Sequence, residues 1–567
     1  MADSNPRDLR NALDRRFATL KTERTEWEHE WTLVQKYVAP KRGRREATDK
    51  YRGRSAHKNI VNNVAARAVR TCANGLAANI INPSTAWFRL APEDDELAEY
   101  GKVREWLGMV EWRVYQILGV GGFYGAATTA LTELVAFGTC ALAEEVNFDT
   151  VRRWHPFTAW EYYAANGADG KATTVYREWS MTTEQLIGNF GPERCSRAVR
   201  MAWETGNLDA KFKIRHAIEP YSDRFASRPG LSRWKYVSAY YDPADDERER
   251  FLRMGGNSFC PVHVARWDHV PPDAYGSGPV ADCLGDVAGL QLIERDMVVG
   301  IGHKTNPAMQ GPATQVNGGA MNPLRFERGS YNPVNGLQEI RPLIDPRSFM
   351  LTDAEAYIER LEQRIARTLY NDLFLAFLSS DRREMTATEV IERAREKLQI
   401  GPVLHNINAE MLSPVINSVV QTIFDESRDF WARGEPGMVP VPPQEIQDAD
   451  LRIEYVSDLQ QSQRLTRAEP IYRLAAFVGE FAAIDPTLPM KIDFHQCADE
   501  LGAALGVPPK TVRDDETVAA MIAEQRAAQQ QAEQQQQQLA QAETIQKLGN
   551  ASTEPGTALG DLAAETA

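Results

Sequence analysis

The chain has 567 residues, of which 43% are hydrophobic and 25% charged, and its formal net charge is −14. This length exceeds what one hydrophobic core usually supports, and the composition is that of folded globular proteins, which excludes a disordered or collagen-like chain. The acidic balance argues against tight nucleic-acid binding, because such binding depends on cations that neutralise phosphates, so any DNA must be held loosely or allowed to slide.

The first predicted element is an amphipathic helix. Residues 1–16 are charged and lack an apolar core, so they are not expected to form a secretory signal. From Leu13 onwards apolar side chains recur every three or four residues, with only Arg24 breaking the series, and the helix is expected to end at Pro40. The stripe includes Trp27 and Trp31, which pack either in the core of the subunit or against another subunit; the pattern leaves both open.

A basic segment follows this helix. Residues 41–58 contain eight Lys or Arg side chains against Glu46 and Asp49. Such a run can bind DNA or a membrane, or it can be a solvated arm or a loop that contacts another subunit. A solvated arm or a loop that contacts another subunit is favoured over binding of DNA or a membrane.

The next part of the chain predicts helices and then strands. Residues 59–81 and 93–120 have helical patterns, and residues 85–90 between them are typical of a short extended segment. Between about 140 and 273, short apolar and aromatic runs are broken by Gly, Pro and Asp, which predicts a mostly β subdomain.

The least polar stretch of the chain is residues 126–143. It contains Glu133 and lacks the flanking residues that usually anchor a membrane helix, so a buried helix is favoured over a membrane span. Together with the basic segment, this stretch would be the evidence for an alternative function, an internal ejection protein that contacts membranes.

The centre of the chain predicts a hairpin of two long helices. The first helix opens at Gly276 and runs to about Lys304, roughly 40 Å at 1.5 Å per residue. Residues 306–346 are rich in Gly, Pro and Asn, as in a small excursion of strands and loops. A capping box of Thr352 and Glu355 starts the second helix, with an apolar stripe at every fourth residue that consists of Leu361, Ile365, Leu369, Leu373 and Phe377.

Further helices are predicted towards the C-terminus. A second capping box, Thr386 and Glu389, starts a third helix that is expected to stop at Gly401-Pro402, and a fourth starts at Ser413-Pro414. Beyond residue 508 the sequence is rich in Ala, Gln and Glu. Such a segment is a marginal helix alone, but it could form a helical collar when packed around an axis with copies of itself.

Two places in the sequence resemble nucleotide-binding motifs, but neither has the spacing that such a motif requires. Residues 302–305, Gly-His-Lys-Thr, resemble the end of a phosphate-binding loop, but a His separates Gly from Lys and the earlier glycines are misplaced. Residues 119–125 are glycine-rich but miss the dinucleotide-binding spacing by one residue, so we interpret them as a hinge. With no paired carboxylate cluster either, a packaging ATPase or nuclease is the disfavoured alternative.

Metal and catalytic sites are equally unsupported. His263 and His269, near Asp268 and Asp273, lack a recognised ligand spacing and are predicted to be ordinary strand-edge and turn residues. The carboxylates at 245–247 are typical of solvated surface. Six widely spaced cysteines form no CxxC pair, so neither a zinc site nor a disulfide framework is expected. We predict no catalytic residue, metal or cofactor, and therefore an architectural protein rather than an enzyme.

Four phrases occur in a characteristic order across most of residues 10–430. They are the Trp-containing helix with its basic segment, ending in PSTAWFRL (83–90); YGSGP (275–279) with LGD (284–286); MTATEV (385–390); and GPVL (401–404) leading to EMLSP (410–414). In combination these phrases resemble the portal, or head-to-tail connecting, protein family of short-tailed bacteriophages. Two departures are an Ile at position 400, where the family pattern would place Leu, and a modest C-terminal helix, which makes a long barrel doubtful.

The resemblance implies a mainly α, α+β portal fold that assembles as a ring, twelvefold in the particle. Its parts would be a wing (1–275), a first stem helix (276–305), a clip (306–350), a second stem helix (351–378), a channel loop (379–388), wing and crown helices (389–507), a crown or barrel helix (508–548) and a disordered tail (549–567).

The resemblance also implies partners and a location. Double-stranded DNA would pass through the ring, with Arg382 and Arg383 of the channel loop as brief DNA contacts. The terminase large subunit and a tail adaptor protein would dock on the clip, and major capsid and scaffolding proteins would surround the ring. The protein would be assembled in the host cytoplasm and reside at the capsid vertex of the virion.

Overall fold

The computed structural model describes residues 6–42, 60–94, 97, 100–226, 228, 230–312, 325–334, 337–343, 351–378, 400–446 and 450–456, and short pieces between 473 and 539. The chain divides into two compact units, the first chiefly residues 1–87 and 112–439, the second residues 88–111, 440–456 and those from 460 onwards. Most of the basic segment, the channel loop with Arg382 and Arg383, the third predicted helix and the tail from 549 lie outside the described residues.

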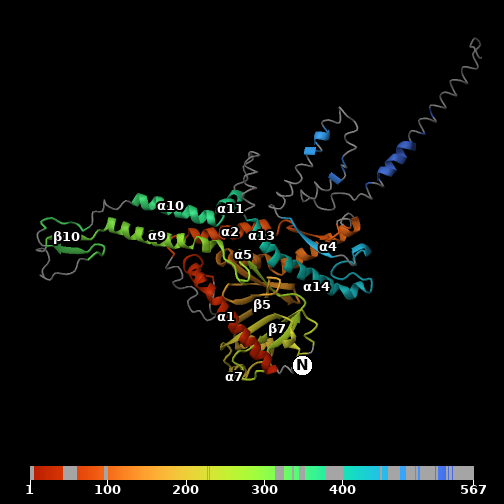
Figure 1. Ribbon diagram of the computed structural model, residues 1–567, viewed down its shortest axis with the longest axis horizontal. Coiled ribbons are helices and arrows are strands. Elements are labelled where there is room, and N and C mark those ends of the chain that lie inside the picture. The colour runs from red at the N-terminus through yellow and green to blue at the C-terminus, as the bar shows by residue number, and fades with distance from the viewer. Residues whose placement is uncertain are drawn as a thin grey trace, which may run out of the picture. The chain divides into compact units, whose positions relative to one another are not determined.

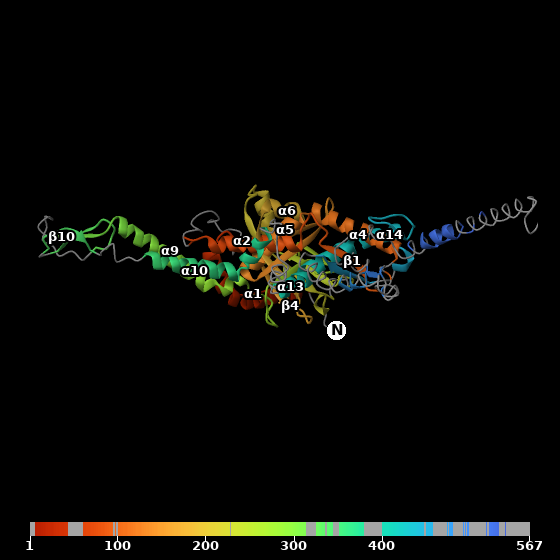
Figure 2. The same cartoon turned by 90° about the horizontal axis from the view of Figure 1, so that it is seen from above.

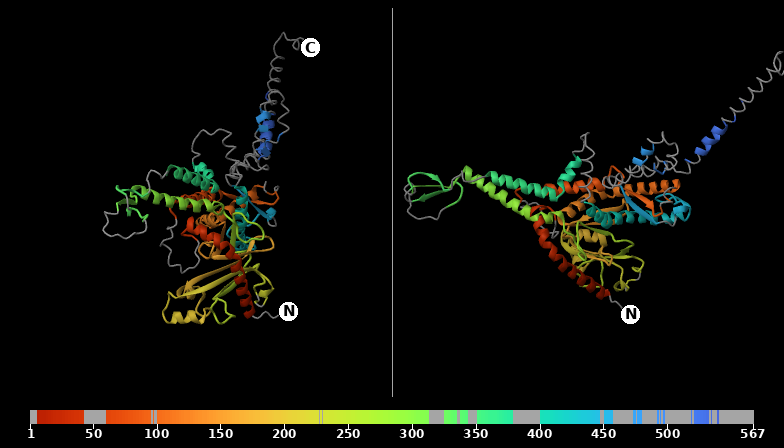
Figure 3. Two further views of the ribbon diagram at one scale, coloured as in Figure 1. Left: turned by 60° about the vertical axis from the view of Figure 1, so that its left-hand side comes forward. Right: turned by 45° about the horizontal axis from the view of Figure 1, so that its top comes forward.

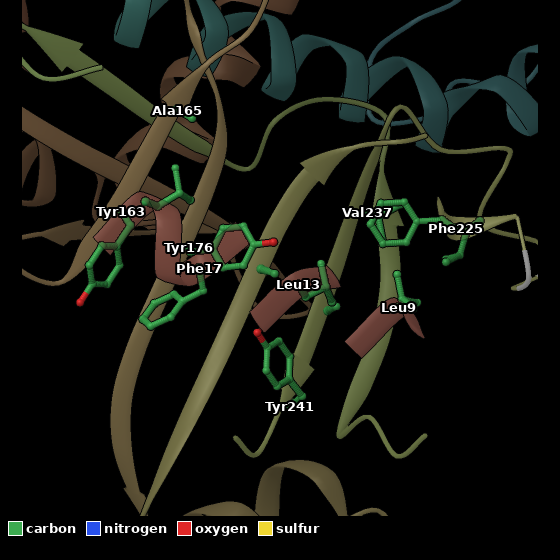
Figure 4. Packing of buried hydrophobic residues seen from close by; sticks show 13 residues of the cluster. Leu9, Leu13, Phe17, Tyr163, Ala165, Tyr176, Phe225, Val237 and Tyr241 are labelled. Carbon is green, nitrogen blue, oxygen red and sulfur yellow. The ribbon is translucent and has the colours of Figure 1, made fainter. Parts of the chain in front are cut away.

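In the first unit, the N-terminal helix α1 (Pro6–Tyr37) packs on a five-stranded antiparallel sheet (Figure 1). The strands lie in the order β4 (Tyr162–Asn166), β5 (Ala172–Thr182), β6 (Lys211–Pro220), β7 (Tyr236–Tyr241) and β8 (Arg253–Asn257). Leu13 and Phe17 of the helix face Tyr163, Tyr176 and Tyr241 of the sheet (Figure 4). The predicted helix and its apolar stripe are confirmed.

Arg24, the break in that stripe, is a buried polar anchor. Its Nη1 donates hydrogen bonds to the carbonyl oxygens of Trp160 and Tyr162 at 2.8 and 2.9 Å, and Nε and Nη2 donate to Glu28. Because buried charges need such partners, the arginine fixes the helix against the chain that leads into β4. Trp31 is fully buried, with its ring against Trp160, so the structure assigns it to the core and not to a contact between subunits.

A second, three-stranded antiparallel sheet lies beneath helix α5 (Phe123–Phe137). Its order is β3 (Val151–Phe157), β2 (Thr139–Asn147) and β9 (Val262–Arg266). The prediction of one helix through residues 126–143 was wrong beyond Phe137, although the burial is as expected. Gly138 has φ +74° and lies against the backbone of residues 276–278, so the helix ends there and a strand begins.

Two helices interrupt the β subdomain and were not predicted. Helix α6 (Thr183–Phe190) starts with a capping box of Thr182 and Gln185, and α7 (Arg197–Glu204) follows it. They enclose a small apolar cluster with Leu186, Cys195 and Ile214. The capping box is visible in the sequence and could have identified α6.

Helix α2 (Val64–Ile80) matches the prediction for 59–81 except that residues 60–63 precede it. In the second unit, β1 (Phe88–Pro92) pairs antiparallel with β13 (Leu451–Tyr455). Helix α4 (Gly101–Val120) begins later than predicted, because the strand pairing continues to Glu93, whose N–H bonds to the carbonyl of Asp450 at 3.0 Å. Among the described residues, no helix combines the length and apolarity needed to span a membrane.

The central hairpin is confirmed. Helices α8 (Pro279–Asp282) and α9 (Leu284–Thr305) lead to a small sheet of order β11-β10-β12, and α10 (Leu351–Thr368) returns beside α9 (Figure 2). The strands of this sheet are β10 (Met309–Pro312), β11 (Tyr331–Val334) and β12 (Arg341–Pro342).

Two details of the returning helix differ from the prediction. Thr352 lies inside the first turn of α10 and does not precede it. The helix is also broken: Tyr370 has φ +55°, a left-handed conformation that an α-helix cannot contain, and α11 (Asn371–Leu378) follows as a separate element.

Gly401 and Pro402 begin helix α13 (Gly401–Ile407), which was not predicted; a proline is tolerated in the first turn because its nitrogen needs no hydrogen bond there. The third predicted helix, which was expected to stop at this Gly-Pro, lies outside the described residues. The fourth predicted helix begins at Ser413, as expected. A π-helical turn (Asn408–Leu412) joins α13 directly to α14 (Ser413–Trp431), and this turn accommodates Pro414, which lacks an N–H to donate.

Candidate functional site: a helical hairpin and its anchorage

The hairpin of α9 and α10 is the most distinctive feature of the first unit. Helix α9 has 22 residues, about 33 Å at 1.5 Å per residue, and α10 lies alongside it with the β10 sheet at the far end (Figure 3). The apolar stripe of α10 is buried at Leu361, Ile365 and Leu369, as its spacing predicted. Burial of this stripe on one side leaves the other sides of the helix free for contacts.

Asn62 and Gln291 fasten the hairpin to the segment before α2. The buried Gln291 amide oxygen accepts from the N–H groups of Val61 and Asn62 at 2.7 and 2.9 Å, and its nitrogen donates to the Asn62 carbonyl at 2.8 Å. The Asn62 amide nitrogen donates to Glu294 of α9 at 2.8 Å and to Glu362 of α10 at 2.7 Å. One side chain thus joins both helices, and hydrogen bonds to carboxylates are the stronger kind.

The sheet at the tip is organised by polar contacts. The buried Asn332 side chain accepts from the N–H of Arg325 at 2.7 Å and donates to the Arg325 carbonyl at 2.9 Å. Tyr331 lies over Gly311, where a Cβ atom would clash, and donates to the Pro312 carbonyl at 3.1 Å. These polar contacts order the described part of the tip.

A buried ion pair ties the sheet to the helices that follow the hairpin. Arg266 of β9 donates from Nε to Glu410 at 3.0 Å and from its backbone N–H at 2.9 Å, and its Nη2 also contacts this carboxylate. The guanidinium further donates to the carbonyls of Asp273 and Gly170. Glu410 lies in the π-helical turn, so the turn aims this carboxylate at the sheet. Sequence reasoning missed both residues.

His263 lies on an edge strand of the three-stranded sheet, as predicted, but its side chain is buried. It is buried on β9, with Nε2 3.4 Å from Oε1 of the buried Glu144, whose other oxygen accepts from Ser418 of α14 at 2.6 Å. His269, Asp268 and Asp273 do not join it: Asp268 pairs through its backbone with Ser277. Within the described ranges, no group of three or more His, Cys, Asp or Glu side chains could hold a metal ion.

The acidic run at 245–247 was predicted to be solvated surface, but one of its three carboxylates is buried. Asp245 is buried and lies 3.6 Å from Arg250, which also contacts Glu247. The exposed Glu247 fits the prediction, and Asp245 does not.

Glu133 of α5 is a fully buried carboxylate. Burial raises its pKa to about 7, against the opposing effect of Arg42, whose Nη1 donates to it at 2.9 Å. Arg42 is the last described residue before the gap at 43–59, so this pair anchors the start of the basic segment to the first unit. Of the glycine-rich residues 119–125, only Gly121 and Gly122 form a turn, which joins α4 to α5 and in which Gly122 has φ +76°, while residues 302–305 end α9.

The comparison with protein families decides the identity of this architecture. The model of the family described as bacteriophage head to tail connecting protein matches residues 10–512. The chain belongs to this family. The probable portal protein of Bordetella phage BPP-1 is 34% identical over 99% of both chains, and the portal protein of Salmonella phage epsilon15 is 29% identical over 97% of both. A chain of a native gene transfer agent virion matches 71% of this chain and 94% of its own at 13% identity and a TM-score of 0.32, too low to support an argument.

The head-to-tail connecting protein is a structural portal subunit of the capsid vertex and not an enzyme, as its sequence predicted. On this portal subunit, large apolar side chains are exposed along α9: Leu292 is 58% exposed, Val298 56% and Val299 48%. Clustered apolar surface on a folded protein marks a site of contact with another macromolecule.

Proposed function

We propose that this portal subunit is one of twelve copies in a closed ring through which double-stranded DNA enters and leaves the capsid. The observation that supports it most directly is the hairpin of α9 and α10, with a small sheet at its tip and apolar side chains exposed along α9. In this proposal α9 and α10 are the stem, residues 306–350 the clip, and the two sheets with α1 the wing. Residues 508–548 form a crown or short barrel inside the head.

A ring of identical subunits requires head-to-tail contacts that close by rotation. Each subunit must therefore carry two different surfaces that fit one another. The exposed apolar side chains of the hairpin are candidates, because they would leave water when neighbouring hairpins pack side by side.

The channel proposed here holds DNA weakly. A subunit with a net charge of −14 repels phosphates, so that DNA meets no deep binding well as it slides. Arg382 and Arg383 of the channel loop are proposed as brief contacts. We expect the isolated ring to bind duplex DNA weakly at physiological salt; sub-micromolar binding measured by fluorescence anisotropy would contradict this.

The tip is the proposed docking site for the terminase large subunit during packaging and for the tail adaptor protein afterwards. Phe326 and Ile340 of the tip are more than half exposed, which supports a protein-binding role for this surface. Major capsid and scaffolding proteins would contact the outer rim when the ring is built into the shell in the host cytoplasm.

The deciding experiment is mass photometry of the purified full-length protein, combined with negative-stain microscopy. We expect closed rings of twelve subunits with a central hole. A monomer or dimer that persists in the presence of the scaffolding protein would contradict the ring.

A further inference from the structure

The charges of helix α10 are sorted by sign around its circumference. Each of its three glutamates is followed five residues later by an arginine, which gives the pairs Glu355 and Arg360, Glu359 and Arg364, Glu362 and Arg367. Successive residues of a helix are about 100° apart, so a separation of five residues corresponds to about 140°. The glutamates therefore lie on one flank of α10 and the arginines on another.

This sorting is unfavourable for α10 by itself. Side chains three or four residues apart are neighbours on a helix, where opposite charges stabilise it and like charges destabilise it. In α10 the Glu and Arg neighbours at these spacings all carry the same sign; they are Glu355 with Glu359, Glu359 with Glu362, Arg360 with Arg364 and Arg364 with Arg367. Compensation for the like charges must therefore come from outside the helix.

The rest of the described chain supplies only part of that compensation. Arg364 pairs with Asp286 of α9 at 2.9 Å, and Glu362 accepts the hydrogen bond from Asn62. In the ranges that the structure describes, Glu355 and Glu359 form no ion pair, and neither do Arg360 and Arg367. Two carboxylates on one flank and two guanidinium groups on the other thus face solvent.

The acidic flank borders a groove between α9 and α10. The groove has a volume of about 390 Å³, and its rim consists of four carboxylates, those of Glu294, Glu355, Glu359 and Glu362. Apolar side chains form its floor. Two of them, Val298 and Ile301, are 56% and 41% exposed in the isolated chain. An apolar floor with an acidic rim suits an aromatic side chain that is flanked by cations.

The basic flank of the same helix presents that combination. Tyr357 is 48% exposed, and it precedes Arg360 by three residues and Arg364 by seven, so that all three lie close together on the outer surface of α10. Tyr and Arg are the residues most enriched among those that dominate the energy of protein interfaces.

We infer that the groove between α9 and α10 of one subunit receives the Tyr357 and arginine flank of α10 from the next copy of this chain. The two surfaces differ and lie on different flanks of one hairpin, which is the arrangement that a head-to-tail ring contact requires. Charge complementarity fixes the direction of the contact, and the apolar floor and Tyr357 exclude water from it. This inference rests on the proposed ring and specifies where two of its subunits meet.

Charge reversal tests the contact. One variant carries Glu355→Arg and Glu359→Arg, which places arginines on both surfaces; a second carries Arg360→Glu and Arg367→Glu, which places glutamates on both. Each variant alone is expected to lose the rings seen for the wild type by mass photometry, while circular dichroism and the thermal midpoint show that the subunit remains folded. Rings formed by either variant alone would overturn the inference.

Two combinations should restore assembly. A chain with all four substitutions again has complementary surfaces and is expected to form rings. A mixture of the two variants is also expected to form rings, with the variants in alternation, because each groove then meets a flank of opposite charge. If both combinations stay unassembled while their subunits are folded, the inference is wrong.

A matched control separates the contact from net charge. The control carries Arg428→Glu and Arg433→Glu, at exposed positions in α14 and just after it. It changes the net charge as much as Arg360→Glu with Arg367→Glu does, and it is expected to keep the rings. Loss of rings in this control would overturn the assignment to α10. Wild-type protein that forms no ring would defeat the proposed function together with the inference, whereas rings that are insensitive to every reversal would defeat the inference alone.

Discussion

The sheet region and the hairpin of the first unit are ordered by different means. Helix α1 and strands β4 to β8 share a large apolar cluster rich in aromatic side chains, and the guanidinium of Arg24, which interrupts the stripe, is hydrogen-bonded at all three nitrogens. The hairpin buries one stripe of α10 and relies on the amide groups of Asn62 and Gln291 to hold its helices to the body. The sheet region therefore has an apolar core of its own within one subunit, while the hairpin has surfaces that, in the proposed ring, a neighbouring copy completes.

The largest effect is expected in the sheet region. Phe17→Ala removes a buried ring that lies 4.8 Å from the ring of Tyr163, and it should lower the free energy of unfolding by about 3–5 kcal/mol. Urea unfolding followed by tryptophan fluorescence measures this. Thr19→Ala, at an exposed position of the same helix, should change it by less than about 0.5 kcal/mol. Equal effects of the two variants would show that the aromatic cluster does not dominate the stability of the sheet region, and the contrast with the hairpin would be lost.

Glu133 gives the sheet region a pH dependence. Its pKa rises from an ordinary value of 4.5 to about 7 on folding, so the folded state binds the proton more tightly than the unfolded chain. This stabilising contribution is complete below pH 4.5 and is lost as the pH rises through 7. The stability of the wild type relative to Glu133→Gln should therefore fall by about 3 kcal/mol between pH 4.5 and 8.

Urea titrations at a series of pH values test this prediction. Glu26→Gln, at an exposed position of α1, is the matched control and should show no such trend relative to the wild type. A stability difference between wild type and Glu133→Gln that stays constant over this pH range would show that the carboxylate is not held in a low-dielectric site.

In the hairpin, the amide clamp is expected to contribute less than the aromatic core. Asn62→Ala removes two hydrogen bonds to carboxylates and should lower the free energy of unfolding by about 1–3 kcal/mol. Its neighbour Asn63 is exposed and makes no side-chain cap to α2, so Asn63→Ala is the control. Hydrogen exchange of α9 and α10 should rise in the first variant only, and unchanged exchange would refute the role of the clamp.

The smallest effect is expected from the surface ion pair between Arg364 and Asp286. Arg364 is 63% exposed, so Arg364→Gln should cost about 0.2–1 kcal/mol, and the cost should shrink at high salt. Arg360→Gln, which removes a charge without an ion-pair partner in the described ranges, is the comparison. A larger, salt-independent loss for Arg364→Gln would place this pair among the structural anchors of the hairpin.

Local patterns were sufficient for much of this fold. The period of the apolar stripe predicted α1, and the Gly- and Pro-rich run between two helical patterns predicted the hairpin with its small sheet. The same local information failed at Gly138, because a buried helix and a buried strand are both continuous apolar runs. It missed helix α13, because Gly-Pro is compatible with the end of one helix and the start of another.

The anchoring residues could not be predicted for a different reason. Asn62 bonds to residues more than 200 positions away, and Arg266 and Glu410 are 144 positions apart, so no window of sequence contains both partners. The sorted charges of α10, in contrast, are visible in the sequence as a spacing of five. That signal was passed over because spacings of three and four are the ones that stabilise a single helix.

The π-helical turn at Asn408–Leu412 has a consequence for how this lineage can change length. Removing one residue between Gly401 and Pro414 would restore ordinary helical spacing, but it would rotate Glu410 or the buried stripe of α14 by about 100° relative to β9. Insertions and deletions should therefore be purged from this stretch during evolution, because either change would separate the ion pair of Glu410 and Arg266 or turn the buried stripe of α14 away from its contacts.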